Sequence, residues 1–84
     1  MKLGLKKGMA FLMFSEAVAL ITRLYEMGTL RVYNPVSRLQ REFRLGYRSA
    51  CLLARLLDTE GYWRRTIDLD GTHIAILAPI KNKT

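Results

Sequence analysis

The sequence predicts an α+β domain in which three helices precede a β-hairpin, and three observations support this. Apolar residues recur at helical spacing from Ala17 to Tyr25 and again from Leu39 to Leu57. The last third of the chain carries two stretches rich in β-branched and aromatic residues, joined at Asp70-Gly71. With 84 residues, half of them apolar, the chain can form one domain with a small core.

The first helix is predicted over SEAVALITRLYEM. Ser15 is expected to cap it, with Glu16 in the first turn, where a negative charge favours the helix dipole. Gly28 is expected to end it. The side chains expected to pack on the core are Ala17, Val18, Ile21, Leu24 and Tyr25.

Residues 1–14 are predicted to form a separate extension, with a basic lead-in from Lys2 to Lys7 and an apolar packing surface from Met9 to Phe14. This stretch resembles the start of a signal peptide, but no convincing cleavage site follows it. It contains no run of about 18 uncharged apolar residues, so no membrane-spanning helix is expected.

A short extended segment is predicted around Leu30, Val32 and Tyr33, and it should end at Asn34-Pro35, because the residue before proline avoids the helical region. Ser37 and Gln40 then have the spacing of a capping box, which predicts the start of the second helix. In that helix Leu39 and Phe43 form an apolar pair on one face.

A bend is expected at Leu45-Gly46-Tyr47, because glycine inside a continuous helix would cost about 1 kcal/mol and a turn avoids that cost. The third helix should begin at Tyr47 or Arg48 and end at Gly61. Its buried stripe is predicted to consist of Ala50, Leu53, Ala54 and Leu57, flanked by Cys51 as a small core residue.

The hairpin is predicted from YWRRTIDL and THIAILA, with a two-residue turn at Asp70-Gly71 and Pro79 ending the second strand. Trp63 is expected to anchor the hairpin on the core, although stacking on a base is an alternative. His73 is expected to be an ordinary surface residue, with contact to a phosphate as the alternative.

This order of elements is that of a winged helix-turn-helix, in which the second helix of the turn enters the DNA major groove. The charge agrees with this interpretation, because 14 Lys and Arg against 7 Asp and Glu give +7, which favours a polyanionic partner, nucleic acid first and an anionic membrane surface second. The alternative is a solvated basic surface. The predicted DNA-binding residues are Arg38, Arg41, Arg44, Tyr47, Arg48, Ser49, Leu52, Arg55, Arg64 and Arg65. Of these, Arg48, Ser49, Leu52 and Arg55 are expected to face the major groove. Phosphate contacts are expected for Arg38, Arg41, Arg44, Arg64 and Arg65.

Catalytic chemistry is not expected. The chain has one cysteine and one histidine, Cys51 and His73, in different segments, so it lacks an internal disulfide and a cysteine-histidine pair. It also lacks a phosphate-binding glycine loop and the spacing of a metal site. Asp68 and Asp70 flank a turn, where aspartate has backbone reasons to occur. We therefore expect neither a cofactor nor a metal.

The stretch LQREFRLGYRSACLLARLLDTEGYW resembles the C-terminal γ domain of FtsK/SpoIIIE-type DNA translocases. The similarity extends from about Phe14 to Ile80, including DGTHIAILAP. It rests chiefly on a Gln-Arg-x-Phe-x-Leu-Gly-Tyr string, which here is Gln40, Arg41, Phe43, Leu45, Gly46 and Tyr47.

The resemblance implies a winged helix that binds duplex DNA at short, G-rich, orienting sequences and contacts a tyrosine recombinase. The chain departs from the family's Asn-Arg pair, which reads bases there, by having Arg48-Ser49, so a different preferred sequence is expected. The segment before Ser37 is longer than usual, and the chain is too short to hold the motor.

These observations predict a winged-helix domain over residues 15–80, with residues 1–14 as an extension and residues 81–84 as a basic tail. The expected function is sequence-preferring binding of double-stranded DNA in the cytoplasm, at the nucleoid, as a stand-alone regulator of a phage or plasmid. The alternative is an adaptor that binds a tyrosine recombinase or another host factor. Whether the protein forms a homodimer, and whether it is a detached piece of a larger one, stays open.

Overall fold

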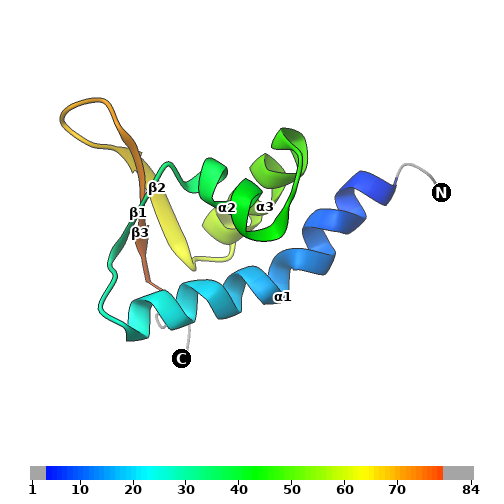
Figure 1. Ribbon diagram of the computed structural model, residues 1–84, viewed down its shortest axis with the longest axis horizontal. Helices are drawn as coiled ribbons and strands as arrows, with labels where there is room; N and C mark the ends of the chain where they lie inside the picture. The colour runs from blue at the N-terminus through cyan, green and yellow to red at the C-terminus, as the bar shows by residue number, and fades with distance from the viewer. Residues whose placement is uncertain (1–3, 79–84) are drawn as a thin grey trace.

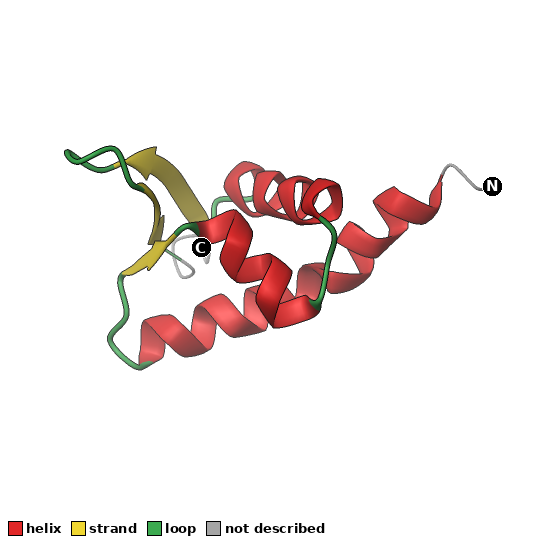
Figure 2. Ribbon diagram, turned by 45° about the horizontal axis from the view of Figure 1, so that its top comes forward, coloured by secondary structure: helices red, strands yellow, loops and turns green. Residues whose placement is uncertain are grey.

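The computed structural model describes residues 4–78, and the side chains of residues 12–78. Its elements are α1 (Gly4–Glu26), β1 (Arg31–Tyr33), α2 (Pro35–Phe43), α3 (Tyr47–Thr59), β2 (Trp63–Ile67) and β3 (His73–Leu77). The three strands form an antiparallel sheet in the order β1-β3-β2. The β2-β3 hairpin projects from one end of the helices, while the first turns of α1 extend past the other end (Figures 1 and 2). The predicted α+β class is confirmed.

Helix α3 is the centre of the core, since α1, α2 and β2 all pack against it. Its buried stripe is Ala50, Leu53, Ala54 and Leu57, as the helical periodicity predicts, and all four are fully buried. The two alanines leave room for a close approach by the neighbouring helices. None of the helices in the described part of the chain is long and apolar enough to cross a membrane.

Helix α1 begins at Gly4, so the prediction that Ser15 caps its start is wrong. Ser15 and Glu16 are exposed positions inside a continuous helix. The longer helix is favoured by packing, because Met13 and Phe14 contact the core and the Phe14 ring meets Tyr62 edge-on at 5.8 Å between centroids. Leu12, in contrast, is 70% exposed.

The division of the chain at residue 14 stays a prediction. The predicted apolar surface from Met9 is described only from Leu12 onward, because the side chains of residues 4–11 lie outside the described part. The predicted basic lead-in from Lys2 to Lys7 falls outside as well, because residues 1–3 are not described at all and only the backbone is described from residue 4 to residue 7. Pro79 and the predicted basic tail, residues 81–84, also lie beyond the described residues.

Helix α2 begins at Pro35, two residues before the predicted capping box, so that prediction is wrong. Proline has a fixed φ and no amide hydrogen, which suits the first helical position. The preceding residue, Asn34, adopts a left-handed conformation with φ of 51° and makes no side-chain capping bond. Leu39 is buried and Phe43 is half-buried against the core, as the predicted apolar pair requires.

The predicted bend between α2 and α3 is confirmed, but the expected role of Gly46 in it is not. The left-handed residue is Arg44, with φ of 54°, while Gly46 has φ of −72° and precedes α3 in an extended conformation. The amides of Arg44 and Leu45 both donate to the carbonyl of Gln40. Leu45 is 6% exposed, so burial of this side chain holds the bend in place.

The connection between β2 and β3 is longer than predicted. Ile67 pairs with His73, which leaves five residues between them, so the predicted two-residue turn at Asp70-Gly71 is wrong. The Asp68 amide donates to the Thr72 carbonyl at 2.8 Å, and Gly71 adopts φ of 88°. Asp68 and Asp70 accept hydrogen bonds from backbone amides of the loop, which is the structural role expected for them.

Candidate nucleic-acid interface

A shallow groove of about 510 Å³ runs along the side of α3 that faces away from the core. The buried stripe occupies one side of this helix, so residues three, four and seven apart line up on the other side. The groove is lined by five α3 side chains and one from β2, namely Tyr47, Arg48, Cys51, Leu52, Arg55 and Arg65. Five of these six were predicted as DNA-binding residues.

Two arginines of the groove are available to an anion. Arg48 and Arg55 are exposed, and neither forms an ion pair among the described residues. They are seven residues apart on α3, which separates them by about 10.5 Å along the helix axis, at 1.5 Å per residue. Three base pairs of duplex DNA rise by a similar distance, at about 3.4 Å per step.

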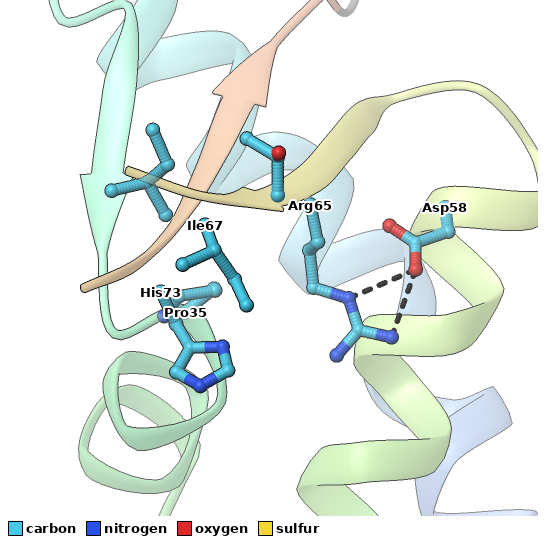
Figure 3. A pocket seen from close by; sticks show the side chains of 7 residues that line it. Pro35, Asp58, Arg65, Ile67 and His73 are labelled. Carbon is cyan, nitrogen blue, oxygen red and sulfur yellow. Dashed lines mark hydrogen bonds and ion pairs between the residues drawn. The ribbon is translucent and has the colours of Figure 1, made fainter. Parts of the chain in front are cut away.

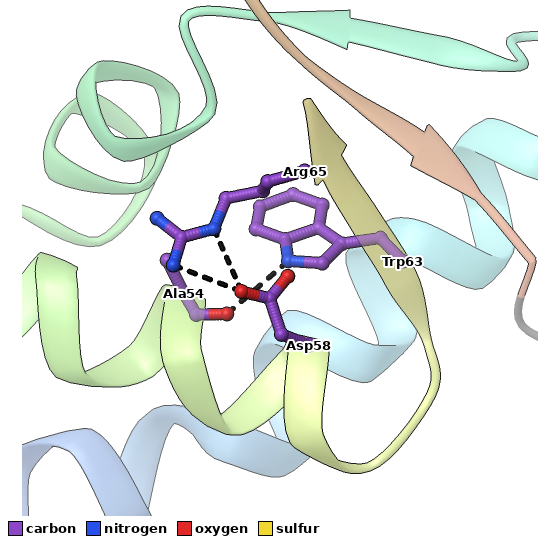
Figure 4. Close-up of polar contacts among 4 residues, drawn as sticks. All are labelled: Ala54, Asp58, Trp63 and Arg65. Atoms are coloured by element: carbon purple, nitrogen blue, oxygen red, sulfur yellow. Dashed lines mark hydrogen bonds and ion pairs between the residues drawn. The ribbon is translucent and has the colours of Figure 1, made fainter. Parts of the chain in front are cut away.

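The hairpin is attached to α3 by Trp63, which is 3% exposed. Its indole N–H donates to the Ala54 carbonyl at 3.2 Å, and this confirms the predicted anchoring role (Figure 4). Arg65 lies two residues further along β2, on the same face, because side chains alternate along a strand. Burial of Trp63 therefore determines which part of α3 the Arg65 side chain contacts.

Arg65 makes an ion pair with Asp58 in the last turns of α3. Its Nε and Nη2 atoms each lie 2.9 Å from Oδ2 of Asp58 (Figures 3 and 4). Both side chains are about one-third exposed, so water screens the pair and its contribution to stability is small, about 0–1 kcal/mol. The pair matters more for the orientation of Arg65, because the contacts with Asp58 hold the plane of the guanidinium in one position beside the groove.

Tyr47 and Cys51 lie one turn apart at the start of the groove. The Tyr47 side chain is two-thirds exposed, and contact with the Cys51 thiol raises the pKa of its phenol, first through a hydrogen bond and then through charge repulsion. The phenol is therefore neutral at pH 7 and can donate a hydrogen bond. Cys51 was expected to be a core residue, but it is half-buried and lines the groove.

Five of the predicted site residues lie outside this groove. Arg64 is exposed on the opposite face of β2 and lines another hollow, with Gly61 and Ile76. Ser49 is half-buried on the flank of α3. The remaining three belong to α2 and the bend. Arg41 and Arg44 are exposed, whereas Arg38 pairs with Glu42 at 2.9 Å along the same helix.

A second hollow, of about 550 Å³, lies between the start of α2, the end of α3 and the hairpin (Figure 3). Asp58 and Arg65 are on one side of it, and Pro35, Ile67 and the exposed His73 are on the other. In the part of the chain that the structure describes, no three His, Cys, Asp or Glu side chains are grouped so as to hold a metal ion.

Sequence reasoning missed Asp58 and Cys51 as residues of the interface. The helical spacing shows that Cys51 is one turn after Tyr47, and this is the available signal for its position in the groove. The partner of Asp58 was not predictable in the same way. Spacing along the helix would pair Asp58 with Arg55, three residues earlier, whereas the observed partner is Arg65 on a strand.

Comparison of the chain with models of known protein families, with curated proteins and with solved structures finds no match. The resemblance to the translocase γ domain therefore rests on the motif residues alone.

Proposed function

We propose that this protein is a sequence-preferring double-stranded DNA-binding protein with a winged-helix fold, related to the γ domain of FtsK/SpoIIIE-type translocases. Helix α3 enters the major groove, Arg48 and Arg55 meet base edges or phosphates there, and the hairpin lies against the flanking backbone. The observation that carries the proposal is the groove of α3, where Arg48 and Arg55 lie on one exposed face of the helix and form no ion pair among the described residues.

The arrangement of elements supports the fold assignment. A helix, a short strand, two helices joined by a tight bend, and a hairpin follow one another, and the short strand joins the sheet beside β3. In a helix-turn-helix the first helix of the pair crosses the DNA backbone while the second enters the groove. Arg41 and Arg44, exposed on α2 and at the bend, suit contacts with phosphates in that geometry.

The distribution of charge supports the choice of partner. The chain carries a formal charge of +7, and Asp58 is the one carboxylate in the last three turns of α3. A chain with this net charge attracts a polyanion over a distance of about 10 Å at 0.1 M salt, and on α3 the exposed Arg48 and Arg55 contribute to that attraction. A negatively charged duplex therefore meets little repulsion along the exposed face of α3.

The proposal is tested by measuring the affinity of the protein for a labelled 20-base-pair duplex at several salt concentrations. R48A and R55A should each weaken binding and reduce the slope of log K against log salt by about 0.9, if the lost side chain meets a phosphate. R23A is the matched control, because it removes the same charge from an exposed position on α1. Equal effects of all three variants would refute docking through α3.

A second candidate function is binding of another protein, such as a tyrosine recombinase, and exposed apolar side chains favour it. Leu12 on α1 is 70% exposed, and Leu69 at the hairpin tip is fully exposed. Leu52 and Leu56, the residues of α3 that would suit such a surface, instead pack partly against the core. Dissociation constants for duplex DNA weaker than about 10⁻⁴ M at physiological salt would favour this candidate.

A further inference from the structure

Arg65 differs from the other exposed arginines of the interface in being held by a carboxylate from a different element. Asp58 on α3 accepts a hydrogen bond from Nε of Arg65 on β2 at 2.9 Å, and Nη2 of the same guanidinium lies 2.9 Å from the same carboxylate oxygen as an ion pair. Arg38 is also paired, but with Glu42 on its own helix, so that pair joins no two elements. The Asp58–Arg65 pair instead connects the hairpin to the helix that carries the groove (Figure 4).

The arrangement of this pair leaves one edge of the guanidinium free. The Nε hydrogen bond and the Nη2 ion-pair contact occupy the side of the guanidinium nearest to Asp58, and Nη1 makes no hydrogen bond within the described residues. Figure 3 shows Nη1 on the side away from the carboxylate. The edge formed by Nη1 and the second hydrogen of Nη2 can therefore donate two parallel hydrogen bonds.

The pair is poorly suited to a purely stabilising role. Both contacts go to Oδ2, while Oδ1 of Asp58 is buried and has no hydrogen-bond partner in the described part of the chain. An unpartnered buried oxygen costs free energy, and a pair that is one-third exposed returns little of it. What the pair does achieve is to fix the plane of a side chain that otherwise has many conformers.

The charge of the pair also distinguishes two kinds of contact. A phosphate attracts an arginine mainly through net charge, and the adjacent carboxylate cancels most of that charge. A guanine presents O6 and N7 as two neutral acceptors, which a fixed planar fork can contact together. A fixed orientation with reduced net charge therefore favours a base over a phosphate.

We propose that Arg65 reads a guanine next to the bases contacted by α3, and that Asp58 is the positioning residue that presents its free edge. This inference rests on the proposed DNA-binding function and refines it, because the sequence alone predicts a phosphate contact for Arg65. Arg64, exposed on the opposite face of the same strand and free of an ion pair among the described residues, keeps the role of a phosphate contact.

The test compares sequence preferences after selection from a library of randomised 20-base-pair duplexes. The wild-type protein should prefer guanine at one position that R65A no longer discriminates, with a loss of roughly 5- to 150-fold at that position alone. R65K should lose the same preference while keeping its salt dependence, because lysine retains the charge but not the planar fork. R64A, the matched control, should weaken binding to all sequences alike and leave the preference intact.

The D58N variant separates a role in base recognition from a purely structural role of the ion pair, because a purely structural role would not change the sequence preference. It removes a negative charge beside the DNA, so affinity for random duplex should rise, while the preference at the Arg65 position should fall. Unchanged preference in both R65K and D58N would overturn the role proposed for Arg65, although the protein still bound DNA. Absence of duplex binding by the wild-type protein at low salt would refute the proposed function itself, and this inference with it.

Discussion

Replacing Trp63 with phenylalanine tests the attachment of the hairpin to α3. The indole is 3% exposed and donates to the Ala54 carbonyl at 3.2 Å. Loss of that hydrogen bond should cost about 1 kcal/mol, and not more, because the same carbonyl also accepts the helical bond from Asp58. The smaller ring leaves a gap of roughly 40 Å³, which at 24 cal/mol per Å³ adds about 1 kcal/mol.

We therefore expect W63F to reduce the free energy of unfolding by about 2 kcal/mol. The assay is urea unfolding followed by far-ultraviolet circular dichroism, because Trp63 is the only tryptophan and its fluorescence is lost in the variant. With an m-value of about 1–2 kcal/mol/M, the midpoint should fall by about 1–2 M. A loss below about 0.5 kcal/mol would contradict the buried, hydrogen-bonded indole.

Three other perturbations follow from particular residues. L57A should destabilise the domain by about 2–5 kcal/mol in the same urea assay, because Leu57 is fully buried, and a loss under 1 kcal/mol would contradict its place in the core. G71A should reduce the free energy of unfolding by about 1–2 kcal/mol, because Gly71 in the hairpin loop has φ of 88°, which alanine adopts only with strain. G46A should change it by less than about 1 kcal/mol, because Gly46 has φ of −72°. Equal losses of stability in thermal unfolding would refute this contrast. Hydrogen bonds from the Thr72 hydroxyl and amide lower the pKa of Asp70, so the carboxylate favours the folded state above the unfolded pKa and this contribution disappears as the pH falls through the folded pKa. A carboxyl titration by NMR should therefore find the pKa of Asp70 below the usual 3.9 or so, and a pKa above that value would contradict the loop geometry.

The helix periodicity and the glycine signals were sufficient to predict the core of α3 and the ends of two helices. Gly28 and Gly61 adopt φ of 94° and 82°, and the amides that follow them, of Thr29 and Tyr62, close back on Leu24 and Leu57. This is the Schellman arrangement that a glycine after the last turn favours. These features depend on residues close together in the sequence, which explains why the sequence alone predicts them.

The failures have a common physical cause in competition between neighbouring signals. Ser37 and Gln40 have capping-box spacing, but Pro35 already provides a preferred first helical residue, and α2 therefore starts there. The sequence favours Gly46 as the flexible residue of the bend, but the bend is formed by the left-handed Arg44 and the buried Leu45. When two local sequence signals have similar strength, tertiary contacts decide which of them sets the start of a helix or the position of a bend.

The sequence predicts most of the residues of the candidate site, but not which side chains of different elements come together there. Helical spacing alone gathers Arg48, Leu52 and Arg55 on one face of α3. Arg65 lines the groove and Arg64 does not, because alternate side chains of β2 point toward α3. The buried Trp63 determines which residues of the strand these are. A one-residue slip in that strand would exchange the two arginines.

Docking of the exposed face of α3 onto duplex DNA can be observed by mapping amide chemical shifts of the ¹⁵N-labelled protein during titration with a 20-base-pair duplex. We expect the largest changes from Tyr47 to Arg55 and around Arg65, and we expect them to fade as the salt concentration is raised. Changes concentrated on the exposed side of α1, with α3 unaffected, would contradict this docking.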